Sequence, residues 1–243
     1  MKKLALCFLT YGNLSQPALW SRIFERDKDL VNVYIHNKNE FVDTEHGLEQ
    51  YCLKERIPTE WGKLSLVKAT LLLFRAALQD SENEFFILLS DRCLPIYPMA
   101  EIYRRVFETD SNIISCFQQN VHRYERLRDK SLFSKENFMM QSQWCILNRE
   151  TAVFFNTRDF TGIFSPEYGV PDEHYFVNLC LAHKIPFENT KITYTRWTAA
   201  DSRHPHMFGR LTETDLKRAQ ESGCLFMRKV SENCRLPVYF DEF

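Results

Sequence analysis

The chain has 243 residues, and its 31 lysines and arginines nearly balance its 32 aspartates and glutamates, which gives a formal net charge of -1. This balance provides no basic surface for nucleic acid or anionic lipid, and an apolar content of 44% is too high for a disordered chain. The longest apolar runs fall far short of the roughly 20 residues that span a bilayer, so we expect no transmembrane segment. A single globular domain over residues 1–243 is predicted.

The first predicted elements alternate between strand and helix. Residues 4–10 and 30–36 are mostly apolar, which is typical of strands buried on both faces. Between them, residues 17–26 carry apolar side chains at helical spacing, and Ser15 is expected to cap the amino end of this helix. Strand, helix and strand within about thirty residues predict a βαβ unit.

The remaining periodic segments continue this alternation. Strands are predicted at 85–89, 112–117, 143–147 and 192–196, and helices at 66–78, 99–107, 172–183 and 213–221, the last closed by Gly223. The polar segment 118–140 is long enough to suggest a functional role. Alternating strands and helices predict an α/β fold with a mostly parallel central sheet flanked by helices.

In sheets of this kind a ligand lies beyond the carboxyl ends of the strands. This rule selects residues 10–13, 36–38 and 90–95 as candidate site segments. The sequence has no G-x-G-x-x-G, P-loop, H-E-x-x-H or G-x-S-x-G motif. Its D-x-D triplet, residues 27–29, lies at the opposite edge of the sheet, so we interpret it as a solvated turn and expect no metal site.

Two further segments carry groups suited to chemistry. Asp172 is expected to cap a helix that begins with Glu173. A carboxylate at this position can accept a proton from a substrate hydroxyl if the nearby rings of Tyr175 and Trp144 raise its pKa. A capped helix start without a catalytic role is the alternative.

Several cations lie close together in sequence near the end of the chain. They could neutralise a diphosphate, or they could form a solvated basic edge. They are Arg196, Arg203, His204, His206, Arg210, Arg228 and Lys229.

Trp61, Trp144 and Trp197 each lie beside polar or small residues. Indole faces stack well on sugar rings, although ordinary core packing is the alternative for each. The eight cysteines are scattered without a C-x-x-C pair, so neither a zinc site nor a redox dithiol is expected. The apolar run after Lys2 and Lys3 is too short for a signal peptide and fits a first strand.

Taken together, these segments resemble the core-2/I-branching glycosyltransferases (glycosyltransferase family 14), in particular their plant-type branch. The resemblance rests on Trp61-Gly62-Lys63, Ser90-Asp91-Arg92-Cys93-Leu94-Pro95 and Pro171-Asp172-Glu173-His174. Matching segments follow in collinear order through nearly the whole chain, at 4–12, 17–20, 33–36, 61–67, 86–97, 142–144, 148–149, 171–175, 193–194, 197, 204–205, 223–226 and 228–229.

The resemblance implies a GT-A-like, Rossmann-type fold and inverting transfer of a sugar from a UDP-sugar to a hydroxyl of a glycan acceptor. It implies no metal and no other cofactor, and Glu173 as the catalytic base. N-acetylglucosamine, xylose and glucuronic acid remain open as the donor sugar. The donor-binding residues it implies are Thr10, Gly12, His36, Asn37, Ser90, Lys229 and a second cation, with Arg203 or Arg210 ranked before Arg228. The acceptor or sugar-binding residues are Trp61, Arg123, Gln143, Trp144 and Asp172.

Three alternatives remain open from the sequence. A catalytically inactive carbohydrate- or nucleotide-binding module on the same fold would bind without transfer, and the Asp172–Glu173 pair argues against it. A metal-dependent transferase would use Asp91. Golgi members of the family carry an amino-terminal membrane anchor, whereas this chain starts at its first predicted strand. We therefore expect a cytoplasmic location, with the secretory pathway as the alternative.

Overall fold

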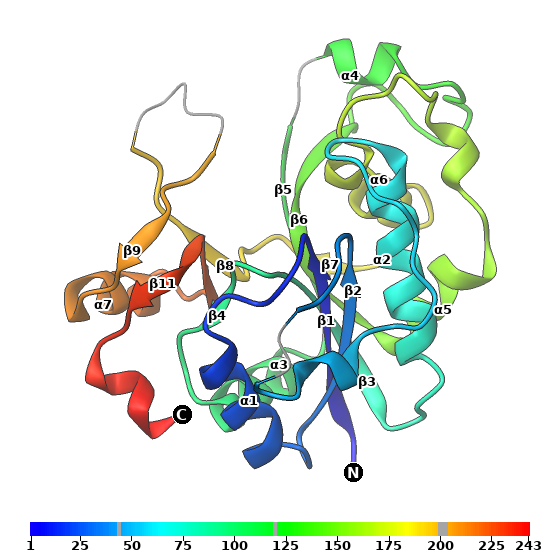
Figure 1. Ribbon diagram of the computed structural model, residues 1–243. Coiled ribbons are helices and arrows are strands. Elements are labelled where there is room, and N and C mark those ends of the chain that lie inside the picture. Colours follow the sequence, from blue (N-terminus) through cyan, green and yellow to red (C-terminus); the bar gives the residue numbers. More distant parts are fainter. Residues whose placement is uncertain (43–44, 119–120, 199–203) are drawn as a thin grey trace.

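The computed structural model describes residues 1–42, 45–118, 121–198 and 204–243. Its central sheet has six strands in the order β2-β1-β3-β6-β5-β7 (Figure 1). β1 pairs in parallel with β2 and β3, and β5 pairs in parallel with β7, whereas β6 runs antiparallel to both β3 and β5. The strands are Lys3–Thr10 (β1), Val31–Asn37 (β2), Asn83–Ser90 (β3), Asn112–Gln118 (β5), Met139–Asn148 (β6) and Phe187–Glu188 (β7). The predicted α/β fold with a mostly parallel central sheet is confirmed.

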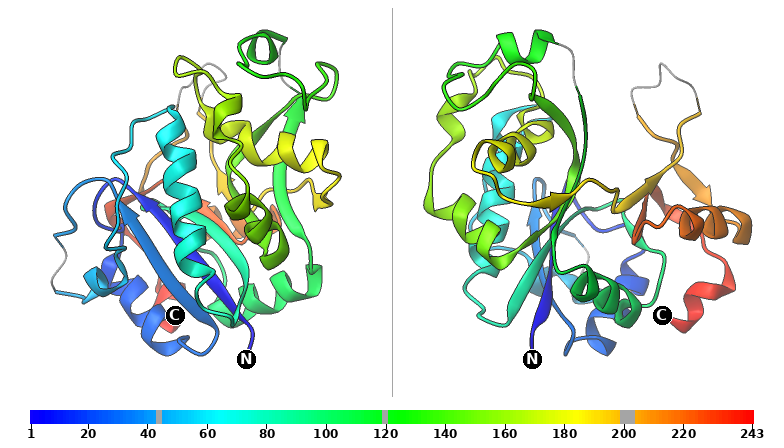
Figure 2. Two further views of the ribbon diagram at one scale, coloured as in Figure 1. Left: turned by 90° about the vertical axis from the view of Figure 1, so that its right-hand side faces the viewer. Right: turned by 180° about the vertical axis from the view of Figure 1, so that it is seen from behind.

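Helices cover both faces of this sheet. α2, α5 and α6 lie on one face, and α1 and α3 lie on the other (Figures 1 and 2). Residues 4–8 of β1 and 85–89 of β3 are fully buried between these layers, which explains why both strands are continuous apolar runs. The helices are Pro17–Arg26 (α1), Leu64–Ala77 (α2), Met99–Thr109 (α3), Arg149–Thr157 (α5) and Tyr175–Ala182 (α6).

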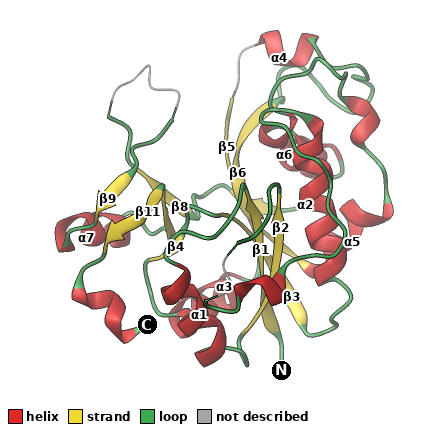
Figure 3. Cartoon of the chain, viewed as in Figure 1, coloured by secondary structure: helices red, strands yellow, loops and turns green. Residues whose placement is uncertain are grey.

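Two small sheets extend the molecule beside the central one (Figure 3). The first contains Leu94–Pro95 (β4), Phe226–Arg228 (β10) and Thr193–Thr195 (β8), and the second contains Val230–Arg235 (β11) and Phe208–Arg210 (β9). Because β4 follows β3 almost at once and pairs antiparallel with β10, it ties the late strand to the carboxyl end of β3.

The short elements complete the described chain. α4 (Val121–Glu125) lies within the polar segment 118–140, and α7 (Glu213–Glu221) begins with a capping box between Thr212 and Asp215. Gly223 follows α7 with φ +75°, and its N–H donates to Gln220 O, as the predicted closure requires. The 3₁₀ turns are Leu48–Tyr51, Thr161–Ile163, Pro171–Glu173 and Val238–Glu242.

Two local predictions were wrong. α1 is capped by Gln16, with φ +58° and no side-chain cap, rather than by Ser15, whose N–H donates instead to Asp91 O at 2.8 Å. The Gln16 amide donates to three carbonyls of the β11 segment, the shortest contact being 2.8 Å to Glu232 O, so tertiary contacts decide this terminus. Asp27 is not a solvated turn residue, because it is buried and accepts from Arg26 Nη2 at 2.6 Å.

No helix within the described ranges is both long enough and apolar enough to cross a bilayer. The single domain over residues 1–243 stays a prediction.

Candidate active site

The carboxyl ends of β1, β2 and β3 meet at one edge of the central sheet. Thr10 pairs with Asn37, and Leu9 pairs with Ser90, so the three strands end side by side. Beyond them, Thr10 O accepts from Lys38 N at 2.9 Å, which joins the two chain segments as they leave the sheet. The structure therefore brings the predicted donor residues at the ends of these strands to a common edge.

His36 and Asn37 offer buried polar atoms at this edge. His36 Nε2 accepts from Ile57 N at 2.9 Å, and burial lowers the pKa of the ring, with a further lowering by Arg56. The neutral ring therefore carries its proton on Nδ1. Within the described part of the chain, His36 Nδ1 and Asn37 Oδ1 are buried without a hydrogen-bond partner.

A cavity of about 720 Å³ opens next to these two residues, at the carboxyl end of β2. Three of its lining side chains are cationic and one is acidic, so it has a net positive lining. The lining residues are Lys38, Asn39, Glu40, Lys54, Arg56, Ile57, Pro58 and Thr59.

The other predicted donor residues near β1 and β3 mainly hold the backbone. Ser90 Oγ accepts from Arg92 N at 3.2 Å and contacts Cys93 Sγ at 3.3 Å, so its hydroxyl supports the turn after β3. Thr10 Oγ1 donates to His36 O across a long 3.5 Å contact. Gly12 has no atom within 4 Å of where a Cβ would lie, so packing does not require a glycine there.

The turn after β3 meets the cations of β10. Burial raises the pKa of Asp91, and the charges of Arg92, Arg228 and Lys229 oppose this rise. Burial and the neighbouring Arg228 lower the pKa of Lys229, which is half-buried. The peptide bond between Arg228 and Lys229 is cis. Asp91 and Lys229 thus face each other across the junction between the central sheet and the small sheet.

Trp144 forms one wall of this region. The Arg228 guanidinium lies 4.5 Å from the centroid of the Trp144 ring, and the indole is only 6% exposed. A guanidinium stacked on a desolvated ring is held in a defined orientation. One face of Trp144 is therefore taken by a cation rather than left free for a sugar. Gln143, the preceding residue of β6, is partly exposed.

Asp172 and Glu173 lie in a 3₁₀ turn instead of at the start of a helix, which corrects the predicted capping role of Asp172. The turn is Pro171–Glu173, and α6 begins only at Tyr175, after His174. Asp172 is 6% exposed, and its Oδ1 has no partner among the described residues. Burial, and secondarily the charge of Glu173, raise the pKa of Asp172 to about 7.

Cations from two other parts of the chain affect the ionisation of Glu173. Burial raises the pKa of its carboxyl group, whereas Arg123 and Arg228 lower it. The predicted base and one of the predicted cations are therefore close enough to interact across the strand ends. Because Arg228 also interacts with Asp91, a continuous charged cluster runs from Glu173 to Lys229.

Two predicted acceptor residues lie on either side of the Glu173 turn. Val170 N donates to Gly62 O at 2.8 Å, which places the 76% exposed Trp61 beside this turn. Arg123 Nη1 donates to Gly169 O, also at 2.8 Å.

The structure separates the remaining cations. Arg210 is exposed on β9, and no contact within the described ranges joins it to the charged cluster. Arg203 lies outside the described residues. The sequence ranks both before Arg228, yet Arg228 is the one that the structure brings to Glu173.

Sequence reasoning selected Arg92 and Cys93 only as part of the candidate segment 90–95 and gave them no role. It considered Asp91 as a metal ligand, and it missed Gly169. Cys93 contacts Ser90 and contributes to the surroundings of Arg228. For Gly169 no signal exists in the sequence, because its role depends on the approach of Arg123.

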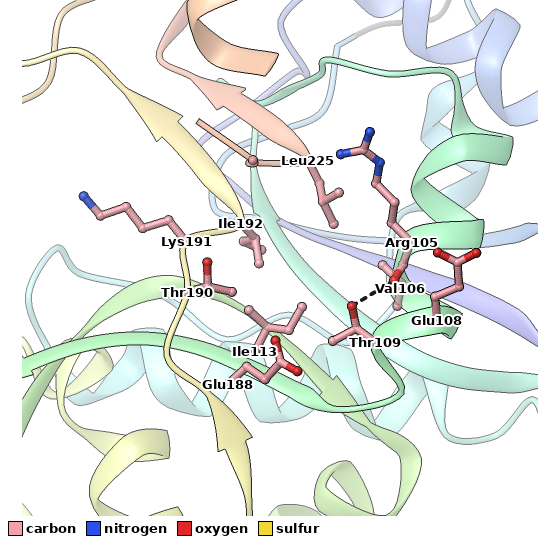
Figure 4. Close-up of a pocket in the computed structure, with 11 residues that line it drawn as sticks. Arg105, Val106, Glu108, Thr109, Ile113, Glu188, Thr190, Lys191, Ile192 and Leu225 are labelled. Atoms are coloured by element: carbon pink, nitrogen blue, oxygen red, sulfur yellow. Dashed lines mark hydrogen bonds between the residues drawn. The ribbon is translucent and has the colours of Figure 1, made fainter. Parts of the chain in front are cut away.

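A second cavity, of about 310 Å³, lies away from these strand ends (Figure 4). Ile113 is at the amino end of β5, and Ile192 and Leu225 precede β8 and β10. By the strand-end rule this is the wrong side of the sheet for the substrate.

A carboxylate that faces cations at the carboxyl edge of a mostly parallel sheet is an arrangement suited to glycosyl transfer. The model of the Core-2/I-Branching enzyme family matches residues 4–220. The chain belongs to this family of glycosyltransferases, and the predicted resemblance is confirmed.

One curated relative is also named a glycosyltransferase. The chain is 24% identical to "Glycosyltransferase BC10" of Oryza sativa subsp. japonica in an alignment 235 residues long, and the match covers 83% of this chain and 59% of that protein. The chain thus matches little more than half the length of that protein.

Two solved structures show weak similarity. A197 from STIV has a TM-score of 0.35 and 13% identity, and the match covers 76% of this chain and 80% of that one. UDP-glucose pyrophosphorylase complexed with UDP-glucose has a TM-score of 0.33 and 12% identity, and the match covers 76% of this chain and 88% of that one. At these TM-scores neither supports an argument about this chain.

Proposed function

We propose that this chain transfers a sugar from a UDP-sugar to a hydroxyl group of a glycan acceptor, with inversion at the anomeric carbon. The observation that carries the proposal is the interaction of Glu173 with Arg228, which lies 4.5 Å from the centroid of the Trp144 ring and next to Lys229. In this reaction the acceptor oxygen forms a bond to the anomeric carbon, and the bond from that carbon to the diphosphate breaks. Glu173 takes the hydroxyl proton, and UDP leaves with the bonding electron pair.

The cations account for the leaving group in this proposal. The diphosphate gains negative charge as the bond breaks, and preorganised cations stabilise that charge most when they are shielded from water. Arg228 is fixed on the Trp144 ring, and Lys229 is half-buried beside it. Both therefore have the burial and the charge that this role requires.

The polar atoms at the end of β2 support uridine as the nucleoside. Uracil presents carbonyl acceptors beside one N–H donor. His36 Nδ1 supplies a buried donor and Asn37 Oδ1 a buried acceptor, next to the cavity of about 720 Å³. Because successive residues of a strand point to opposite faces, we assign the contact with the uracil N–H to Asn37 Oδ1 alone. The amide nitrogen of Asn37 donates to the carbonyl of Asn39, which lines the cavity.

We also propose that the reaction needs no metal ion and no cofactor. Support comes from the surroundings of Asp91, whose charged neighbours are Arg92, Arg228 and Lys229 rather than further carboxylates. A divalent cation prefers several oxygen ligands and is repelled by cations. Asp91 is therefore poorly placed to serve the metal-dependent alternative.

A panel of UDP-sugars tests the donor and the metal requirement together. UDP-N-acetylglucosamine, UDP-xylose and UDP-glucuronic acid are compared in thermal unfolding and in transfer assays, each with and without EDTA. We expect one donor to raise the melting temperature, because a ligand that binds only the native state stabilises it. The rise and the transfer activity are expected to persist in EDTA, and loss of both would favour the metal-dependent alternative.

Glu173→Gln tests the base. The amide cannot accept the proton, so transfer is expected to fall by roughly 10²–10⁴-fold while UDP still binds. Glu167→Gln is the matched control, because Glu167 is exposed on the same segment. Full activity of the Glu173 variant would remove this residue from the mechanism. A wild-type chain that binds a UDP-sugar but transfers nothing would instead support the inactive binding module.

A further inference from the structure

The turn that carries Glu173 is held by a side chain distant in sequence. Arg123 comes from α4, and its Nη1 donates to Gly169 O at 2.8 Å. A Cβ at Gly169 would lie 2.9 Å from that same nitrogen, which is closer than such atoms approach. A side chain at residue 169 would therefore displace the guanidinium from its present position.

The opposite side of the turn is fixed by backbone. Val170 N donates to Gly62 O, and Val170 has φ +53°, in the left-handed region that β-branched residues rarely adopt. A Cβ at Gly62 would lie 3.4 Å from Val170 Cγ1, so the two segments pack closely. Arg123 and Gly62 together hold the turn from both sides, and of the two only Arg123 brings a charge.

Within the described part of the chain, two cations act on Glu173, and Glu173 in turn acts on Asp172. Asp172 lies on the same turn, Arg123 comes from α4, and Arg228 comes from β10. His174 adds no charge, because burial lowers its pKa to about 4. Arg228 also interacts with Asp91 and is the cation proposed for the diphosphate. Arg123 is thus the cation available to stay with the carboxylate throughout the reaction.

We infer that Arg123 is a positioning residue for Glu173. Its hydrogen bond to Gly169 O holds the turn that carries the carboxylate. This inference rests on the proposed function, in which Glu173 accepts the proton. Without Arg123 the carboxylate keeps its burial but loses one of its two stabilising cations. Glu173 then becomes protonated at a higher pH than in the wild type.

The test uses two variants that disturb the same contact from opposite ends. Arg123→Gln removes the charge, and Gly169→Ala displaces the guanidinium while Arg123 is retained. Arg123→Lys keeps a positive charge and is the conservative variant. Arg126→Gln is the control for the arginine variants, and Gly162→Ala is the control for the glycine variant, because a Cβ at Gly162 meets nothing within 4 Å.

Two readouts are combined. The pH dependence of kcat/KM reports the base in the free enzyme, and ¹³C NMR of glutamate-labelled protein reports the Glu173 carboxyl directly, with Glu173→Gln identifying its signal. In Arg123→Gln and Gly169→Ala we expect the acidic limb of the kcat/KM profile to move to higher pH. The midpoint of the Glu173 NMR titration is expected to move in the same direction. Arg123→Lys is expected to return them toward the wild type, and the two controls to leave them unchanged.

An unchanged Glu173 midpoint in folded Arg123→Gln or Gly169→Ala would overturn the inference, whatever the loss of activity. A midpoint that moves equally in Arg126→Gln would also overturn it, because the effect would then come from general charge. The NMR titration needs no substrate. If the wild type transfers no sugar, the proposed function fails while the effect of Arg123 on Glu173 is still measured.

Discussion

Replacing Asp172 with asparagine is expected to destabilise the protein at pH 4 and to stabilise it at pH 8. Burial, followed by the charge of Glu173, raises the pKa of Asp172 from its ordinary value of 3.8 to about 7. The folded chain therefore binds this proton more tightly than the unfolded chain. The resulting stabilisation is fully present below about pH 4, is lost as the pH rises toward 7, and changes no further above 7.

The size of the effect follows from the two pKa values. The interval from 3.8 to about 7 corresponds to about 4 kcal/mol in the free energy of unfolding. Asparagine avoids the burial of a charge. However, its amide N–H donors occupy the position of Asp172 Oδ1, which has no partner among the described residues, so these donors are left unpaired. An unsatisfied buried group costs about 1–3 kcal/mol. Asp172→Asn is therefore expected to be more stable than the wild type by about 1–3 kcal/mol at pH 8 and less stable by a similar amount at pH 4.

Chemical denaturation of both proteins at several pH values between 4 and 8 measures this difference. Asp241→Asn is the matched control, because Asp241 is exposed near the end of the chain. A difference between Asp172→Asn and the wild type that stays constant over this range would refute the reasoning. The carboxyl group would then titrate alike in the folded and unfolded chains.

Two further predictions concern the nucleotide. Lys229→Ala is expected to weaken UDP binding by about 10–150-fold, since a hydrogen bond to a charged group contributes about 1.5–3 kcal/mol, and calorimetry that gives an unchanged Kd would exclude a phosphate role for Lys229. Asn37→Ala is expected to weaken UDP binding by about 5–150-fold, because it removes the proposed acceptor for the uracil N–H, whereas replacement of the exposed Asn233 of β11 by alanine is expected to leave binding unchanged. Equal losses in both variants would point to a local change in the fold instead.

The sequence predicts β1 and β3 well because these two strands are buried on both faces. Residues 4–9 and 85–89 are apolar without interruption, which is typical of strands between two layers of helices. The direction of β6 has no such signal, because hydrophobic periodicity is the same for parallel and antiparallel strands. Its antiparallel pairing with β3 and β5 emerges only in the folded chain.

The candidate site was harder to predict where it depends on tertiary contacts. An acidic residue after proline suits a 3₁₀ turn as well as the first turn of an α-helix, so the pattern around Asp172 did not distinguish them. The cations near the end of the chain look equivalent in sequence. Arg228 stands apart only because the pairing of β4 with β10 carries it to Asp91 and Trp144.

The pairing of β4 with β10 also bears on how the chain matures during synthesis. All six strands of the central sheet precede residue 189, whereas Arg228 and Lys229 follow it by a long interval of chain. The cations proposed for the leaving group thus belong to the last part of the site to be synthesised. Docking of the late strand onto Leu94 and Pro95 brings them to the carboxyl end of β3, so the site is complete only once this strand has paired.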